Sequence, residues 1–302
     1  MNKSLYVSVF LAGTVLQGLA HDEQHRSTLS MTIEDDLGRA VTFNKNPQRI
    51  ISLAPSITEM LFALDSGATL VGVTDYCNFP PAAQQKPSVG GMILPNLERI
   101  AELQPDLILL TVEGNSKEDF TKLESLGYRL FVLNPRTIEE VDESITDLGK
   151  ILGKDSAASS LFNGLRNRES RVHHAIQGRK FPSVFVIISL KPLMTAGPGT
   201  FIHQLIVKAG GLNIADHARV AYPIINREEI IRARPDVILV ANDIMRSTRE
   251  LLKEFPEWEK LPAVANGRIL AVDADILTRP GPRIIDGLEM LARIFHPDLI
   301  PR

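Results

Sequence analysis

The sequence predicts an α/β fold of two similar lobes, each built on a parallel, doubly wound sheet and joined by one long helix. Two observations carry this prediction: an internal repeat of strand and helix signals, and a proline-free segment between its two copies. Strands that alternate with helices favour parallel sheets, because a helix must carry the chain back before the next parallel strand can start. The length of 302 residues is enough for two medium-sized domains.

Residues 1–20 have the pattern of a cleaved signal peptide. A single lysine precedes an apolar run from Leu5 to Leu16, and small residues lead up to Ala20. This run is shorter than the roughly 20 residues of a spanning helix, although an N-terminal membrane anchor is the alternative. We expect cleavage after about Ala20 and a periplasmic protein. Cys77 is the only cysteine, so neither lipoprotein attachment nor an intramolecular disulfide is expected.

One pattern of strand and helix signals occurs twice, at an offset of 226 − 96 = 130 residues. The first copy runs over residues 96–109 and the second over 226–239, and Asn, Glu, Ile, Pro, Asp, Ile and Leu recur in register. In each copy the asparagine caps a short helix whose first turn carries a glutamate, Glu98 or Glu228. Pro-Asp then ends the helix and opens an apolar strand, predicted at 107–111 in the first copy and at 237–241 in the second. The repeat therefore indicates two lobes of one fold.

Further signals flank each copy of the repeat. Apolar strands are predicted at 49–53, 130–133, 183–188 and 269–272, and helices at 57–64 and 201–209. Glycines follow both helices and are expected to end them, Gly67 the first and Gly210-Gly211 the second. The expected organisation is a signal peptide (1–20), an N-terminal extension (21–47), an N-terminal α/β lobe (48–140), a helical linker (141–180) and a C-terminal α/β lobe (181–302).

A long helix is predicted between the lobes. Residues 156–177 contain no proline and only one glycine, and apolar residues recur near helical spacing. Such a helix would be about 33 Å long, enough to run along a small domain. A single crossing of this kind is expected to be stiffer than a connection of two or three strands.

Loops that follow the strands are the predicted ligand contacts, because ligands of open parallel sheets bind beyond the carboxyl ends of the strands. Tyr76 and Tyr222 are candidates to lay an aromatic ring on an apolar ligand. Asp275 and Arg279 follow a predicted strand and are candidates to hydrogen-bond amides or carboxylates. For each of these residues an ordinary surface loop is the alternative. Other candidate loops are Ala54–Ser56, Gly90–Met92 (with Gly91), Glu113–Asn115 and Lys191–Pro192.

Residues 49–59, 75–81 and 96–106 resemble the periplasmic receptors for cobalamin, siderophores and haem, the soluble components of ABC importers. The resemblance runs from Thr32 to Leu291, and Phe79-Pro80-Pro81 and Pro282-Arg283-Ile284 resemble the cobalamin-binding members in particular. It implies a class III periplasmic binding protein, a helical-backbone metal receptor with two Rossmann-like lobes bridged by a long rigid helix. It also implies a monomer without cofactor or enzymatic activity, whose partners are an ABC permease dimer and its ATPase.

The resemblance further implies roles for single residues. Tyr76, Asp275 and Arg279 match positions that contact cobalamin in those members, Tyr222 stands where they have tryptophan, and Gly91 and Met92 lie at a further pocket position. Two pocket tryptophans are missing, where the sequence reads Gly90-Gly91-Met92 and Leu110-Thr111-Val112. The implied ligand is a metal chelate such as a corrinoid, with haem or a ferric siderophore as the alternative.

Glu98 and Glu228 match the surface glutamates that pair with permease arginines in this family. Matched charges on both lobes suit a receptor that docks on a twofold-symmetric permease. The alternative is that both are helix-dipole carboxylates in a duplicated fold.

An α/β enzyme that uses the same region is the main alternative class. The sequence contains no GxSxG elbow, no phosphate-binding Walker loop and no zinc-ligand spacing. His173 and His174 are adjacent on a predicted helix, so they point in different directions and do not form a metal pair. A net charge of −3 disfavours nucleic acid as a partner. We therefore expect a binding protein for a small molecule, without a metal site of its own.

Overall fold

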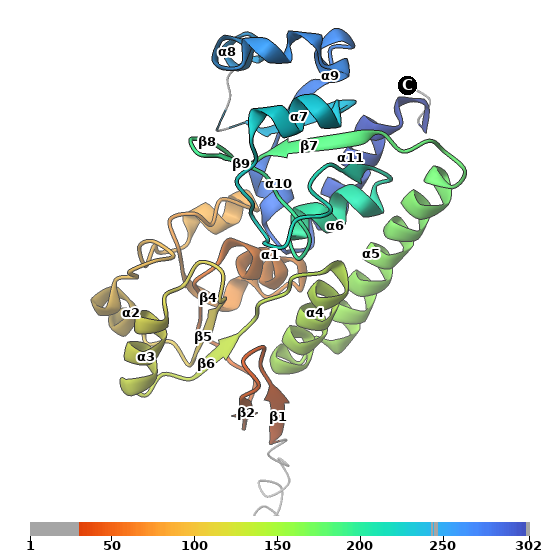
Figure 1. Cartoon of the computed structure of the whole chain (residues 1–302). Coiled ribbons are helices and arrows are strands. Elements are labelled where there is room, and N and C mark those ends of the chain that lie inside the picture. Colours follow the sequence, from red (N-terminus) through yellow and green to blue (C-terminus); the bar gives the residue numbers. More distant parts are fainter. Residues whose placement is uncertain (1–29, 243, 245–246, 300–302) are drawn as a thin grey trace, which may run out of the picture.

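The computed structural model describes residues 30–242, 244 and 247–299 and shows two α/β lobes joined along one side by a long helix (Figure 1). The predicted signal peptide lies outside these residues. The first sheet has the order β4-β3-β5-β6 and the second the order β10-β7-β11-β12, with all pairs parallel. Counted within each lobe, both orders read 2-1-3-4. The repeat in the sequence is thus a repeat of topology.

The strands of the two sheets are short, and most of their residues are buried, with Leu212 and Ala271 the exposed exceptions. The first sheet contains β3 (Ile50–Ser52), β4 (Leu70–Val73), β5 (Leu107–Leu110) and β6 (Leu130–Val132). The second contains β7 (Ser183–Ile187), β10 (Leu212–Asn213), β11 (Val237–Ala241) and β12 (Ile269–Val272). The predicted strands at 49–53, 107–111, 130–133, 183–188, 237–241 and 269–272 are confirmed. β4 and β10 were not predicted from the sequence.

Helices cover both faces of each sheet. In the first lobe they are α1 (Pro55–Ala63), α2 (Leu97–Leu103), α3 (Lys117–Ser125) and α4 (Ile138–Leu152). In the second they are α6 (Phe201–Lys208), α7 (Arg227–Ala233), α8 (Thr248–Glu254), α9 (Pro262–Ala265), α10 (Ala274–Thr278) and α11 (Ile284–Phe295). Short 3₁₀ turns occupy 67–69, 81–85, 256–260 and 297–299.

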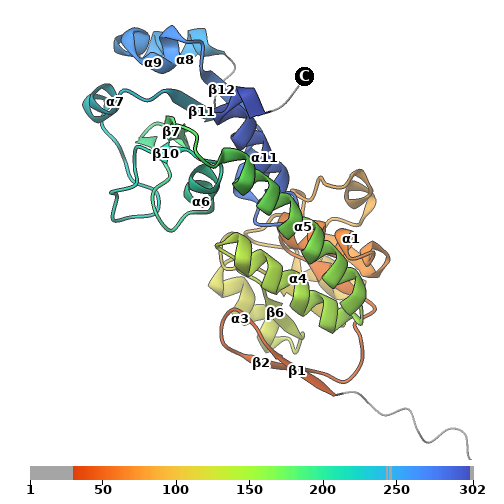
Figure 2. The same ribbon diagram turned by 90° about the vertical axis from the view of Figure 1, so that its right-hand side faces the viewer.

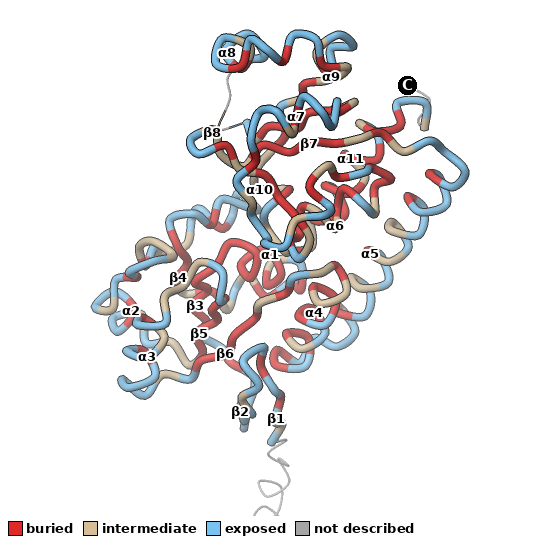
Figure 3. The backbone as a smooth tube through the Cα atoms, viewed as in Figure 1, coloured by how far each residue is buried: buried red, intermediate tan, exposed pale blue. Residues whose placement is uncertain are grey.

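The long helix α5 (Asp155–Ile176) spans 22 residues and confirms the prediction. It packs on α4 in the first lobe and on α11 in the second, while its outer side is exposed (Figures 2 and 3). Its buried residues are Ala158, Leu165, Val172 and Ile176, spaced so that one stripe faces the protein.

Strand residues alternate between two cores, because successive side chains of a strand point to opposite faces. Leu107 and Leu109 of β5, like Leu239 of β11, belong to one core that continues through both lobes beneath α4, α5 and α11. Ile108 of β5 belongs to an outer core under α2 and α3, and Ile238 of β11 to one under α7 and α8. The lobes are therefore joined by a shared apolar core as well as by a helix.

Two hairpins stand apart from the main sheets. β1 (Met31–Glu34) and β2 (Ala40–Phe43) pair antiparallel, and β8 (Ser189–Leu190) pairs with β9 (Leu193–Met194) around Lys191–Pro192. The Asp36 N–H donates to the Val132 carbonyl at 3.1 Å, so the first hairpin covers the free edge of β6.

The predicted role of Gly67 as a helix end is wrong. Helix α1 ends earlier, at Ala63, and Gly67 starts a 3₁₀ turn. A Cβ at Gly67 would lie 2.4 Å from the Phe62 ring, so glycine is needed there for close packing. Gly210 does follow α6 with a φ of +79°, as predicted for a helix end. No helix among the described residues is long and apolar enough to cross a bilayer.

Candidate functional site

Tyr76 and Gly91 lie side by side on two loops of the first lobe. The Val89 N–H donates to the Val73 carbonyl at 2.8 Å and the Asp75 N–H to the Gly90 carbonyl at 2.9 Å, which ties the 88–96 segment to the end of β4. A Cβ on Gly91 would lie 4.0 Å from the Tyr76 ring. The predicted ligand residues Tyr76 and Gly91 are thus brought together.

Asn115 connects three loops at the same edge of the sheet. Its side-chain amide donates to the Leu53 carbonyl at 3.1 Å and to the Met92 carbonyl at 2.8 Å, and its Oδ1 accepts the Thr111 N–H at 2.9 Å. Met92 is half-buried and lies over Gly114, where a Cβ would come within 2.3 Å of the Met92 methyl. The Met92 side chain therefore packs against the loop that carries Gly114.

The corresponding loop of the second lobe presents Tyr222. The Gly197 N–H donates to the Ala221 carbonyl at 2.7 Å and the Thr195 N–H to the Pro223 carbonyl at 3.1 Å. A Cβ on Gly197 would lie 2.9 Å from the Val220 carbonyl oxygen, so the close approach of the two segments requires glycine. These contacts hold the loop while leaving Tyr222 44% exposed.

The Tyr222 hydroxyl is partly buried. Burial raises the pKa of the Tyr222 hydroxyl above its ordinary value, and the carboxylate of Glu113, which follows β5 of the other lobe, raises this pKa further. The phenol is therefore neutral at neutral pH.

Exposed apolar side chains gather on these facing loops. Tyr76 is 59% exposed and Leu94 74% exposed. The others on these loops are Ile93 and Val112 in the first lobe and Val220, Tyr222 and Ile224 in the second. The single tryptophan, Trp258, is instead buried in the second lobe against Phe255, so the aromatic surface of the site comes from tyrosines. These residues are therefore the candidate apolar contacts of a ligand.

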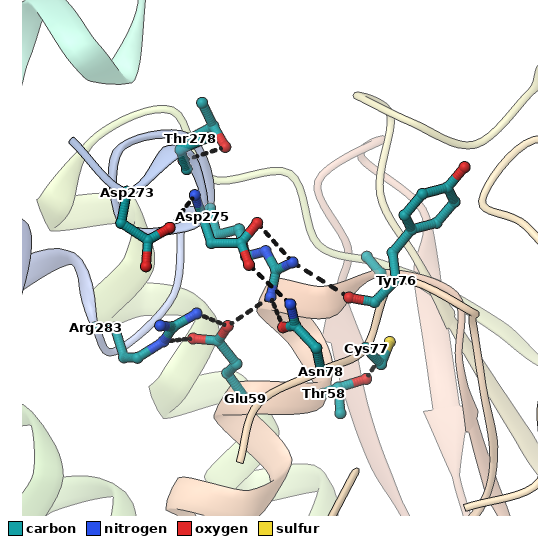
Figure 4. Close-up of polar contacts among 12 residues, drawn as sticks. Thr58, Glu59, Tyr76, Cys77, Asn78, Asp273, Asp275, Thr278 and Arg283 are labelled. Atoms are coloured by element: carbon teal, nitrogen blue, oxygen red, sulfur yellow. Dashed lines mark hydrogen bonds and ion pairs between the residues drawn. The ribbon is translucent and has the colours of Figure 1, made fainter. Parts of the chain in front are cut away.

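Asp275 and Arg279 lie at the contact between the lobes. The Arg279 guanidinium forms an ion pair with the Asp275 carboxylate at 2.7 Å. It also donates to Asn78 Oδ1 at 2.6 Å and to the Tyr76 carbonyl at 3.2 Å. The Asn78 side-chain amide donates to the Asp275 carboxylate at 2.9 Å (Figure 4). The Tyr76 ring points away from this cluster (Figure 4). The structure thus brings Arg279 to the backbone of the Tyr76 loop and not to its ring.

Glu59 and Arg283 complete this cluster and were not predicted as site residues. Arg283 holds the Glu59 carboxylate with two bonds, of 2.9 and 2.7 Å, and Arg279 donates to the same carboxylate at 3.3 Å. The Glu59 hydrogen bonds, opposed in part by burial, hold the pKa of Arg283 above its ordinary value. We call Glu59, Asn78, Asp275, Arg279 and Arg283 the interlobe clamp.

Other candidates are placed differently. Ala54–Ser56, predicted as a ligand loop, are buried at the start of α1. Lys191–Pro192 form the turn of the β8–β9 hairpin, where Lys191 pairs with Glu254 at 3.3 Å.

Glu98 and Glu228 are exposed in the first turns of α2 and α7, as the repeat predicts. Asn96 and Asn226 accept the N–H of Arg99 and Glu229, at 2.9 and 2.8 Å, which confirms both predicted caps. Within the described part of the chain, neither Glu98 nor Glu228 forms an ion pair.

A pair of parallel α/β lobes bridged by one helix, with apolar loops on their facing edges, defines a two-lobed binding protein. A model of the family described as periplasmic binding protein matches residues 50–276, and the chain belongs to this family. It is therefore a binding protein and not an enzyme, and it has no cofactor of its own. Across residues 30–242, 244 and 247–299, no group of three or more His, Cys, Asp or Glu is arranged to hold a metal.

Two curated relatives illustrate the range of the family. The vitamin B12-binding protein of Salmonella typhimurium is 31% identical over 237 residues, which cover 78% of this chain and 86% of the relative. An uncharacterized ABC transporter substrate-binding lipoprotein of Bacillus subtilis is 28% identical over an alignment of 309 positions that covers 97% of each chain.

Solved structures agree with this fold. The periplasmic vitamin B12-binding protein of Vibrio cholerae superposes with a TM-score of 0.72 at 28% identity, covering 82% of this chain and 96% of that one. The periplasmic heme-binding protein of Roseiflexus gives a TM-score of 0.76 at 26% identity, with coverages of 84% and 99%. The predicted fold class is thereby confirmed.

Proposed function

We propose that this protein is the periplasmic substrate-binding component of an ABC importer and that it binds a corrinoid between its lobes. The observation that carries the proposal is the set of exposed apolar side chains on the facing loops, with Tyr76 on one lobe and Tyr222 on the other. Rings on both sides suit a large, flat ligand, because each face of such a ligand needs an apolar contact. The vitamin B12-binding relatives support the corrinoid in particular.

Haem or a ferric siderophore is the second candidate ligand. Similar structures include heme-binding proteins and a protein of an Fe3+-hydroxamate transport system. The facing loops carry no tryptophan, so aromatic contacts with any of these ligands would come from Tyr76 and Tyr222. Tyr76, Gly91, Met92 and Tyr222 would contact any of these ligands. Asp275 and Arg279 would shape the site through the Tyr76 loop.

We further propose that Glu98 and Glu228 dock the loaded protein onto the permease. Both are exposed, both lie in the first turn of a capped helix, and each lobe supplies one. Delivery would follow capture between the lobes and a small closure, driven by ATP hydrolysis in the partner ATPase. The protein would act as a monomer, exported by a signal peptide cleaved after about Ala20 and not attached as a lipoprotein.

Titration calorimetry of the purified mature protein with cyanocobalamin, haemin and a ferric hydroxamate tests the ligand. We expect one-to-one submicromolar binding of cyanocobalamin, and Tyr76→Ala and Tyr222→Ala each to weaken it about tenfold, the worth of a lost aromatic contact. Leu126→Ala, an exposed apolar residue outside the facing loops, is the control and should bind normally. Binding of haemin or of the hydroxamate alone would replace the corrinoid assignment. No binding of any of the three would refute the ligand class.

A further inference from the structure

The interlobe clamp is built around one buried anion. Glu59 lies in α1 of the first lobe, and its side chain is 2% exposed. Both of its cationic partners, Arg279 and Arg283, come from the second lobe, 220 and 224 residues along the chain. A buried carboxylate is stable only when its charge is matched and its oxygens are hydrogen-bonded. Glu59 meets both conditions only while the two lobes stay in contact at this point.

The backbone around the clamp is packed to fit this contact. A Cβ on Gly281, between the two arginines, would lie 3.3 Å from the Ser56 carbonyl oxygen of α1. The Arg283 guanidinium also lies over the Phe79 ring, 4.1 Å from its centroid, which adds a cation–π contact. One segment of the second lobe, 279–283, therefore packs closely on two segments of the first, at Ser56 and at Phe79.

The clamp continues directly into the candidate ligand site. Arg279 donates to the Glu59 carboxylate and to the Tyr76 carbonyl. Asn78 accepts a hydrogen bond from Arg279 and donates one to Asp275. Tyr76 and Asn78 belong to the same loop, so a shift of Arg279 would move the residue that presents a ring to the ligand. Arg279 thus links the Glu59 carboxylate to the loop that carries Tyr76.

We propose that Glu59 is a positioning residue: through Arg279 and Arg283 it fixes the relative orientation of the two lobes and the placement of the Tyr76 loop. The shared apolar core joins the lobes beneath α4, α5 and α11, and the clamp is an additional contact that crosses between them. The effect on lobe orientation does not depend on the proposed ligand, whereas the effect on affinity rests on the proposed function.

Pulsed electron paramagnetic resonance, which measures the distance between two spin labels, tests the proposal on the full-length mature protein. Spin labels at Lys122→Cys in the first lobe and Lys253→Cys in the second report the separation of the lobes, and the native Cys77 is kept because its thiol is buried. The parent should give one narrow distance distribution. Glu59→Gln should broaden or shift it, because a neutral amide cannot match two guanidinium charges, and Arg283→Met should do the same from the other side.

Asp35→Asn is the matched control. Asp35 is also a buried carboxylate with an arginine partner, yet its bonds to Leu37, Arg39 and Val132 all lie within the first lobe. It should lower thermal stability without changing the distance distribution. An unchanged distribution in both Glu59→Gln and Arg283→Met would overturn the proposal.

Cyanocobalamin titration of the same variants separates the two claims. Glu59→Gln should weaken cyanocobalamin binding about tenfold, because only part of the free energy lost by unpairing the buried charges acts on the Tyr76 loop. Asp35→Asn should bind cyanocobalamin normally. Wild-type affinity in Glu59→Gln would overturn the role in placing the Tyr76 loop. If the parent protein itself binds none of the tested ligands, the proposed function fails, and the distance distributions alone decide the role of Glu59 in lobe orientation.

Discussion

Asp106 and Asp236 occupy the same place in their respective lobes. The Asp106 carboxylate accepts the N–H groups of Gln48 and Arg49 at 2.9 and 3.0 Å, just before β3, and the Asp236 carboxylate accepts the Ser183 N–H at 2.9 Å, at the start of β7. In each lobe the aspartate of the repeated Pro-Asp thus anchors the first strand of the sheet. The recurrence of this residue in the sequence has a structural cause, independent of any ligand.

Replacement of either aspartate should therefore destabilise its own lobe. We expect Asp236→Ala to lower the free energy of unfolding by about 1–3 kcal/mol, because it leaves the Ser183 N–H without a partner. Asp106→Ala should act alike in the first lobe. Urea denaturation followed by circular dichroism measures the effect, with Asp298→Ala, an exposed carboxylate near the C-terminus, as the control. Equal midpoints for wild type and both variants would contradict this role.

Asn115→Asp should loosen the ligand loops of the first lobe. The substitution keeps the acceptor for Thr111 but replaces an amide donor with a second oxygen that faces the Leu53 and Met92 carbonyls. We expect a loss of about 2–3 kcal/mol in stability from unpaired and repelling groups, together with weaker ligand binding. Thermal unfolding and cyanocobalamin titration measure both. Asn266→Asp, at an exposed turn of the second lobe, should change neither; an equal effect of the two variants would contradict the prediction.

Charge reversal at the docking glutamates should abolish uptake without changing ligand affinity. In Glu98→Arg/Glu228→Arg the proposed contacts with permease arginines become repulsive. Both residues lie in the first turns of α2 and α7 and are not among the residues proposed to contact the ligand. Uptake of labelled cobalamin by cells and titration of the purified variant are the two measurements. Glu102→Arg, on the same helix as Glu98, is the control. A parallel loss of affinity would show that the docking assignment is wrong.

His296 should make the protein less stable in mild acid. Burial is the main cause that lowers the pKa of His296 in the folded state below its ordinary value of 6.5, and the positive charge of Arg179 is the second cause. The unfolded state therefore takes up a proton first as the pH falls, so stability is complete above about pH 6.5 and is lost below it. Urea midpoints at pH 7.5 and 5.5 should differ more in wild type than in His296→Gln. The same difference in both would exclude His296 as the cause.

Asp142 should act in the opposite direction. Burial is the main cause that raises its pKa to about 6, and the ion pair with Arg166 at 2.6 Å opposes this only in part. Between about pH 4 and 6 the folded state holds the proton more tightly, so this group stabilises the protein as the pH falls through that window. Asp142→Asn should be more stable than wild type at pH 7.5, with the gain shrinking toward pH 4. A gain that is constant with pH would contradict this.

Much of the fold was predictable because the two lobes carry the same local signals. The caps at Asn96 and Asn226, the buried strands and the proline-free helix α5 are all set by residues close in sequence, and all are found. β10 was missed because two residues, Leu212–Asn213, show no periodicity. The order 2-1-3-4 within each sheet was not predicted either, because strand neighbours depend on contacts between distant segments.

The site was predictable only at the level of loops. Tyr76 follows the end of β4, and hydrogen bonds between residues 89–90 and this end bring Gly91 beside it. Both loops were named as candidates from the sequence, but β4 was not predicted, so their contact was not indicated by the strand pattern. The partners of Arg279 could not be found in this way. Glu59 lies 220 residues earlier and inside a helix, so only the packing of one lobe on the other reveals that it meets the arginine.

The single crossing by α5 also bears on the order in which the molecule forms. Since all strands of the first sheet lie before residue 133 and all strands of the second after residue 182, neither sheet waits for a strand from the other half. Sequential synthesis or export can therefore complete the first lobe while the second is still unfolded, as domains that form contiguous units generally do. The last step would be the arrival of α11, which packs on α5 and brings Arg283 to Glu59. Assembly of this protein should thus end with the docking of two preformed halves.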